Sequence, residues 1–161
     1  MADEPKSLFE AVEKRNGALA SEFLRNGEDP NLTDKDGQTP LLCASWNKDL
    51  EAVKLLLDAG ADPNIADKDG WTPLLWASWN RHEAMMKLLL EAKSNPNLSD
   101  KNGWTPLLWS SHFGRSEVVK ILLDAKADTN LADKYGQTPL YSASTGGHAE
   151  VVKLLRDAGA K

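Results

Sequence analysis

The chain has 161 residues, enough for one domain with a sizeable core, and its formal net charge is −5. Acidic residues are spread along the sequence, so we expect no nucleic-acid partner, because phosphate binding needs a basic face. A single cysteine, Cys43, excludes an internal disulfide, and no apolar run approaches the ~20 residues of a membrane span. The first residues show no secretory signal, so we expect a cytoplasmic or nuclear protein.

Residues 1–33 carry two helical patterns. Ser7 and Glu10 have the spacing of a capping box before the first pattern, and Asn26-Gly27 is a stop signal after the second. Glu22 stands where later units carry leucine or isoleucine, which suits a face open to water. We therefore predict an N-terminal capping unit over 1–33.

A nine-residue phrase then recurs every 33 positions, beginning at Gly37, Gly70, Gly103 and Gly136. Its second copy reads Gly-Trp-Thr-Pro-Leu-Leu-Trp-Ala-Ser. A fixed period of this length is typical of a stacked repeat array. We predict full repeats over 34–66, 67–99 and 100–132, and a C-terminal capping repeat over 133–161.

Each full repeat has the same predicted order of elements. In the first, a turn ends at Gly37. Thr39 can then cap a helix, and Pro40 suits the first turn of that helix. We expect this helix to reach about Asn47, and a second helix to run from Leu50 to about Asp58. In the last repeat Arg156 replaces an apolar residue, as expected where the outward face meets water.

These residues resemble the ankyrin repeat over essentially the whole chain. The shared phrases are Asp-x-x-Gly-x-Thr-Pro-Leu, then Leu-Leu, then Gly-Ala-Asp-x-Asn. The resemblance implies an all-α fold, a single domain over 1–161, in which antiparallel helix pairs stack into a curved solenoid with β-turn fingers. It also implies a non-catalytic protein that binds other proteins through the fingers and the concave face of the inner helices.

The family's Gly-His pair between the two helices survives only as Gly147-His148, where the histidine is expected to form a loop hydrogen bond. The corresponding places hold Lys48-Asp49, Arg81-His82 and Gly114-Arg115. A non-glycine residue in the left-handed conformation costs ~1 kcal/mol, so we expect Asn47 and Asn80 to adopt it instead. In the later loop, Lys93 and Lys126 likewise replace glycine.

Helical periodicity separates two faces of each inner helix. Leu41 and its equivalents, the eighth residue of each repeat, should face the second helix. The tenth, thirteenth and fourteenth residues share the opposite face, which the resemblance makes the concave groove. We predict that a partner contacts this face and the fingers at Trp46, Trp71, Trp76, Trp79, Trp104, Trp109, His112, Phe113 and Tyr135.

Two kinds of tryptophan need separate interpretation. Trp76 and Trp109 are as well explained by packing between neighbouring inner helices as by partner contact. Trp71 and Trp104 lie on the fingers, where a short turn offers little for an indole to pack against, so partner contact is the better explanation. Exposed apolar patches usually mark binding surfaces, and tryptophan is a leading hot-spot residue.

The spacing of the repeats suggests the shape of the partner. Adjacent inner helices should lie ~8–10 Å apart, and an extended chain advances ~3.3 Å per residue. Every third side chain would then meet the next repeat, so we expect a protein loop or an extended, apolar or proline-containing peptide. Two alternatives are a small molecule held by the central tryptophans and an engineered or reconstructed scaffold without an evolved partner.

We find no sequence pattern for catalysis, a cofactor or a metal, and we expect a monomer. His82, His112 and His148 fall in different repeats and form no ligand cluster with Cys43. The repeated Asp-Lys pairs, as at Asp67-Lys68, are interpreted as solvated turns. One asparagine in the loop that ends each repeat is assigned to turn hydrogen bonding, at Asn64, Asn97 and Asn130.

Overall fold

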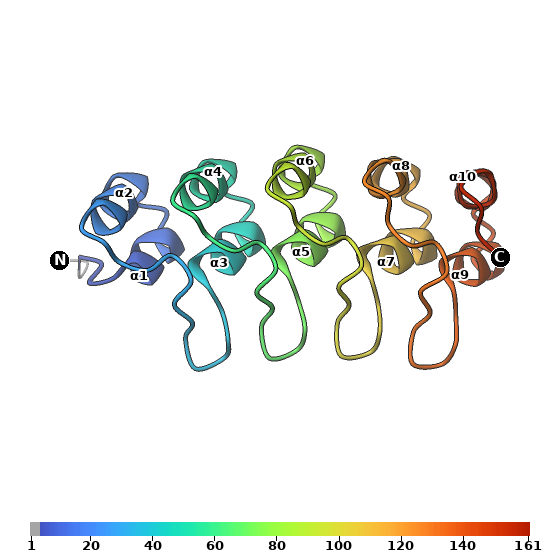
Figure 1. The fold of residues 1–161 in the computed structure, drawn as a ribbon, viewed down its shortest axis with the longest axis horizontal. Helices are drawn as coiled ribbons and strands as arrows, with labels where there is room; N and C mark the ends of the chain where they lie inside the picture. Colours follow the sequence, from blue (N-terminus) through green and yellow to red (C-terminus); the bar gives the residue numbers. More distant parts are fainter. Residues whose placement is uncertain (1–3) are drawn as a thin grey trace.

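The computed structural model describes residues 4–161 as a row of helix pairs, with the loops between pairs projecting to one side as fingers (Figure 1). The described residues contain no strand, so the predicted all-α repeat fold is confirmed. The helices are α1 (Leu8–Glu13), α2 (Gly17–Arg25), α3 (Pro40–Trp46), α4 (Leu50–Asp58), α5 (Pro73–Trp79), α6 (Glu83–Glu91), α7 (Pro106–His112), α8 (Ser116–Asp124), α9 (Pro139–Thr145) and α10 (Ala149–Asp157).

The Thr-Pro dipeptide starts the inner helices α3, α5, α7 and α9. In α5 the Thr72 hydroxyl accepts a hydrogen bond from the Leu75 backbone N–H, and Pro73 occupies the first turn, where a missing N–H costs nothing. The other three inner helices begin in the same way. The first helix, α1, is capped by Ser7 as predicted, but the Glu10 carboxylate accepts from the Lys6 N–H, so the capping box is only half formed.

Stacking of equivalent helices creates the core. Each inner helix packs on the inner helices before and after it and on its own outer helix, and the outer helices pack on one another. Leu41, Leu74 and Leu107 are fully buried between the two layers, as predicted for the eighth residue of a repeat. At the two ends, Glu22 and Arg156 are exposed, as expected of capping units.

The fingers are joined to one another by backbone hydrogen bonds. The Lys68 N–H donates to the Asp36 carbonyl at 3.1 Å, and the same bond recurs between the later fingers. Within a finger, the Asp67 carboxylate accepts from the backbone N–H groups of Asp69 and Trp71. The interpretation of the Asp-Lys pairs as solvated turns is therefore wrong for Asp100 and Asp133, whereas Asp34 is exposed. Asp100 and Asp133 are buried, because each carboxylate turns inward to cap its own turn.

The left-handed conformation falls on the basic residues and not on the asparagines. Lys48 and Arg81 have φ of 56° and 57°, whereas Asn47 and Asn80 are ordinary right-handed C-caps. The prediction for the asparagines is wrong because the backbone hydrogen bonds that close the loop determine which residue takes the positive φ. For example, the Asp49 N–H donates to the Ala44 carbonyl, which closes the turn around residue 48.

Within residues 4–161, every helix is too short or too polar to cross a lipid bilayer. The division of the chain into one domain with two capping units stays a prediction. The pairs α1/α2 and α9/α10 occupy the two ends of the row (Figure 1).

Candidate functional site

The candidate site is a cluster of aromatic rings contributed by the inner helices α3, α5 and α7 and by the two fingers before α5 and α7. We call it the tryptophan surface. Its members are Trp46, Trp71, Trp76, Trp79, Trp104, Trp109, His112 and Phe113. Every one of these residues belongs to the predicted partner-binding set. The helical period of the inner helices and the overhang of the fingers together bring them onto one side of the stack.

The first half of the tryptophan surface is centred on Trp76. The Trp71 ring, from the finger, stacks on it with centroids 4.2 Å apart and an angle of 27° between the planes. The Trp46 ring, from the preceding repeat, meets Trp76 edge-on at 4.4 Å. Offset stacks and edge-to-face pairs are the favoured geometries for aromatic rings, and each adds about 0.5–1.5 kcal/mol beyond its buried area.

The second half repeats this arrangement around Trp109. The finger residue Trp104 lies 4.4 Å from it, and Phe113 stacks beside it at 5.7 Å with nearly parallel rings. Trp79 joins the two halves, because its ring lies 4.9 Å from that of Trp109 and 6.2 Å from that of Trp71. The rings are therefore continuous across three repeats.

The finger tryptophans do find packing partners, contrary to expectation. Trp71 and Trp104 fold back from their turns onto Trp76 and Trp109 and are only partly exposed. Sequence reasoning missed this contact because it looked for partners within the finger itself. The helix tryptophan that receives each indole comes later in the same repeat.

The rings are exposed to different degrees. Trp46 and Phe113, at the two ends, keep 56% and 44% of their surface exposed, whereas Trp76 and Trp109 are half-buried. The indole N–H groups of Trp76 and Trp109 are buried without a hydrogen-bond acceptor among residues 4–161. These two tryptophans thus contribute to packing and also leave polar groups unsatisfied.

Arg115 borders the tryptophan surface and was not among the predicted residues. Its guanidinium lies over the rings of Trp79, at 5.4 Å, and Phe113, at 5.1 Å. It also donates to the backbone carbonyls of Trp79, at 2.7 Å, and Ser78, at 3.2 Å. Burial and the nearby charge of Arg81 lower the pKa of Arg115. One feature of the sequence could have pointed to Arg115: in the pair Gly114-Arg115, the arginine stands where the family's Gly-His pair has its histidine.

His148 occupies the same place one repeat later. Its Nε2 lies 2.9 Å from the carbonyl oxygen of His112 in the preceding inner helix, which confirms the predicted loop hydrogen bond. The loop asparagines are also confirmed as hydrogen-bonding residues. The Oδ1 of Asn64 accepts from the Asn95 N–H, and Asn97 and Asn130 make the same contact with the next loop.

Tyr135 lies apart from the tryptophan surface. It is 73% exposed at the last finger, and its ring contacts only the ammonium group of Lys134, at 5.2 Å, among the ring and cation contacts of residues 4–161. Tyr135 precedes the glycine of its finger, Gly136, whereas Trp71 and Trp104 follow theirs, so their equivalent in the last repeat is Gln137. The tenth position, which is tryptophan in both central repeats, is Ser142 in the last repeat.

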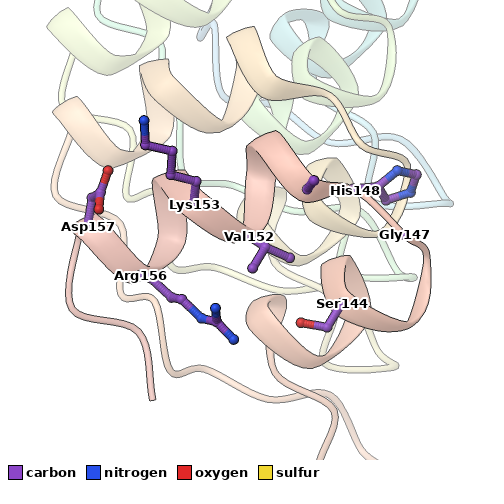
Figure 2. A pocket seen from close by; sticks show the side chains of 8 residues that line it. Ser144, Gly147, His148, Val152, Lys153, Arg156 and Asp157 are labelled. Atoms are coloured by element: carbon purple, nitrogen blue, oxygen red, sulfur yellow. The ribbon is translucent and has the colours of Figure 1, made fainter.

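Two pockets bear on the choice of ligand. One, of about 280 Å³, lies on the tryptophan surface between Gln38, Trp46 and Trp76. The other, of about 550 Å³, lies at the end of the stack, where Val152 and Arg156 extend from α10 toward α9 (Figure 2). In the preceding repeats, the residues equivalent to Val152 are fully buried by the next repeat. The larger pocket is therefore an uncovered stacking face.

Residues suited to metal or nucleophilic chemistry are dispersed. Residues 4–161 contain no group of three histidine, cysteine, aspartate or glutamate side chains arranged to hold a metal ion. His82 accepts from the Met85 N–H and so caps α6. Burial, assisted by the charges of Glu13 and Asp34, raises the pKa of the Cys43 thiol from 9.0 to about 11. A thiol with this pKa stays protonated near neutral pH and is a poor nucleophile.

Comparison with known proteins gives one family. Two matches to a family model described as ankyrin repeats, in three copies, cover residues 8–100 and 84–161. No curated protein matches the chain.

Proposed function

We propose that this chain, which belongs to the ankyrin-repeat family, binds a protein loop or an extended peptide on the tryptophan surface. Members of the family are generally non-catalytic protein–protein interaction modules. We propose further that the chain acts as a monomer in the cytoplasm or nucleus, without a cofactor and without nucleic acid. Tyr135, at the last finger, is a separate proposed contact.

The observation that carries this proposal is the continuity of the rings over three repeats. A buried aromatic side chain removes about 150–250 Å² of surface from water, and tryptophan dominates measured binding hot spots. Trp46 and Phe113 remain largely exposed at the two ends of the cluster. Scaffold packing would not require exposed rings there, whereas a partner that lies along the stack would cover both.

A small-molecule site has weaker support. The pocket between Gln38, Trp46 and Trp76 holds about 280 Å³, below the roughly 300–1,000 Å³ of most ligand pockets. The central rings contact one another, as in the stacked pair Trp71 and Trp76 at 4.2 Å, and leave no cage between them. A long, shallow aromatic surface suits a polypeptide better.

The proposal is tested by affinity capture from a cell lysate. The chain is compared with a triple variant carrying Trp46→Ala, Trp79→Ala and Phe113→Ala. The matched control carries Leu32→Ala and Tyr141→Ala, since both residues are exposed and lie outside the tryptophan surface. Circular dichroism verifies that each variant keeps its helices.

We expect at least one protein to be retained by the chain and by the control and lost from the triple variant. The captured protein is then titrated as a purified component, so that direct binding is measured. Identical capture by all three proteins would show that the tryptophan surface is not a binding site.

A further inference from the structure

We infer that the segment bound on the tryptophan surface is acidic and proline-rich and lies there as a polyproline II helix. This inference rests on the proposed function and specifies the chemistry of the partner. Two observations carry it: the spacing of the rings along the stack, and a row of basic side chains without ion-pair partners among residues 4–161 along one border of the tryptophan surface.

The first observation concerns period. Equivalent rings recur once per repeat, as Trp46 and Trp79 do on α3 and α5, and adjacent inner helices stand about 8–10 Å apart. A polyproline II helix has three residues per turn and rises about 3.1 Å per residue, so the same face returns every ~9 Å. In a β-strand, successive side chains point to opposite sides, so a side chain three residues further on points away from the tryptophan surface. Only the former presents a proline to each successive repeat.

The second observation concerns charge. We call Arg15, Lys48, Arg81 and Arg115 the basic row. The first three are equivalent residues of successive repeats and share the left-handed conformation, with φ of 54–57°. Arg115 places the row at the border of the tryptophan surface, because its guanidinium covers the rings of Trp79 and Phe113. At the other end, Arg15 donates to the carbonyl of Asn47, beside Trp46.

The middle of the basic row has no internal counter-charge. Across residues 4–161, Lys48 and Arg81 take part in no ion pair and no side-chain hydrogen bond. Acidic residues lie near the row as well: Asp49 and Glu51 line a pocket with Arg15, and Glu83 and Glu117 line one with Arg81. Glu117 is paired with Lys120 at 2.7 Å. Within residues 4–161 none of these carboxylates forms an ion pair with Lys48 or Arg81, so both cations are available to a partner. A carboxylate on the partner would supply the missing counter-charge.

The unsatisfied indoles favour the same ligand. The N–H groups of Trp76 and Trp109 have no acceptor within the described part of the chain. A polyproline II segment makes no internal hydrogen bonds, so its carbonyls are free to accept. Such a segment would lie over the rings, and a rotation of either half-buried helix indole would bring its N–H to one of these carbonyls. Aromatic-lined surfaces are the common receptors for this conformation.

Selection from a displayed library of random 15-residue peptides, a length of about five turns of polyproline II, tests the inference. The chain, the Trp46→Ala/Trp79→Ala/Phe113→Ala variant and the Leu32→Ala/Tyr141→Ala control are each used as bait. We expect peptides retained by the chain and the control to carry prolines three residues apart together with Asp or Glu. Retained peptides without that pattern that still require the three aromatic residues would overturn this inference and leave the proposed function standing. Failure to retain any peptide that depends on these residues would overturn both.

A charge cycle on one selected peptide tests the basic row. Its acidic residues are changed to glutamine, and the chain is given Lys48→Gln and Arg81→Gln. The control variant, Lys87→Gln with Lys93→Gln, removes the same charge from the outer side of the stack. We expect the peptide change to weaken binding about tenfold on the chain and on the control, and less than about twofold on the Lys48/Arg81 variant. Equal weakening on all three proteins would exclude the basic row as the acidic contact.

Discussion

At the scale of single residues, several basic residues in the loops adopt a left-handed backbone conformation that is unfavourable for a residue with a side chain. Lys93 and Lys126 have φ of 69° and 62°, the conformation that Gly60 adopts at the same place in the first full repeat. A side chain there costs about 1 kcal/mol relative to glycine. Unlike Lys48 and Arg81, these two lysines belong neither to the tryptophan surface nor to the basic row, so their replacement should affect stability alone.

Lys93→Gly and Lys126→Gly should each raise the free energy of unfolding by about 0.5–1 kcal/mol, because glycine removes the left-handed strain. Urea denaturation measures the change. Lys87→Gly is the matched control, since Lys87 lies exposed within α6, where glycine should instead lower stability by about 1 kcal/mol. Equal losses at all three positions would contradict the assignment of strain.

Cys43 should make stability depend on pH in the alkaline range. Burial is the main cause that raises its pKa from 9.0 to about 11 in the folded chain. Above pH 9 the unfolded chain therefore releases the thiol proton first, and the free energy of unfolding should fall as pH rises toward 11. The difference between the chain and Cys43→Ala, followed by urea denaturation over this range, isolates the thiol. Parallel curves for the two proteins would show that the thiol is not shielded.

At the scale of the elements, the fingers form a continuous layer and are not independent loops. A Cβ added at Gly70 would lie 2.9 Å from the Cα of Asp100 in the next finger. At Gly136, the equivalent residue of the last finger, nothing lies within 4 Å. Both glycines have positive φ, of 83° and 77°. The pair therefore separates the cost of backbone conformation from the cost of finger contact.

Gly136→Ala should destabilise the chain by about 1–2 kcal/mol, the cost of the left-handed conformation alone. Gly70→Ala should cost a further 1–3 kcal/mol or so, because the methyl group meets the backbone of the neighbouring finger. Thermal or urea unfolding of the two variants makes the comparison. If Gly136→Ala were the more damaging change, the contact between fingers would not hold.

Local signals predicted most of the elements. The bounds of α4, Leu50–Asp58, are those expected, because caps and turn residues act within a few positions. The conformation of Lys48 was assigned to its neighbour, since residue preference is weaker than the hydrogen bonds that close the loop. Arg115 was missed because its acceptor, the Trp79 carbonyl, lies 36 residues away in the preceding repeat.

At the scale of the whole molecule, the repeat period predicted the stack, and stacking in turn creates the tryptophan surface. The sequence predicted that these rings share one face, but it could not show that Trp71 folds onto Trp76 or that the rings join across repeats. Those contacts depend on the separation of neighbouring repeats and on the angle of the fingers. We assign these rings to a partner and the leucines of the eighth position to the core.

This central claim is tested most directly by the affinity of a captured partner for the Trp46→Ala/Trp79→Ala/Phe113→Ala variant, measured by titration calorimetry. Hot-spot aromatic residues contribute roughly 1–2 kcal/mol or more each, so we predict a dissociation constant raised by about 100-fold or more. The Leu32→Ala/Tyr141→Ala control should bind within about twofold of the chain, as expected for residues outside the contact. A triple variant that stays folded and binds as tightly as the control would contradict the account.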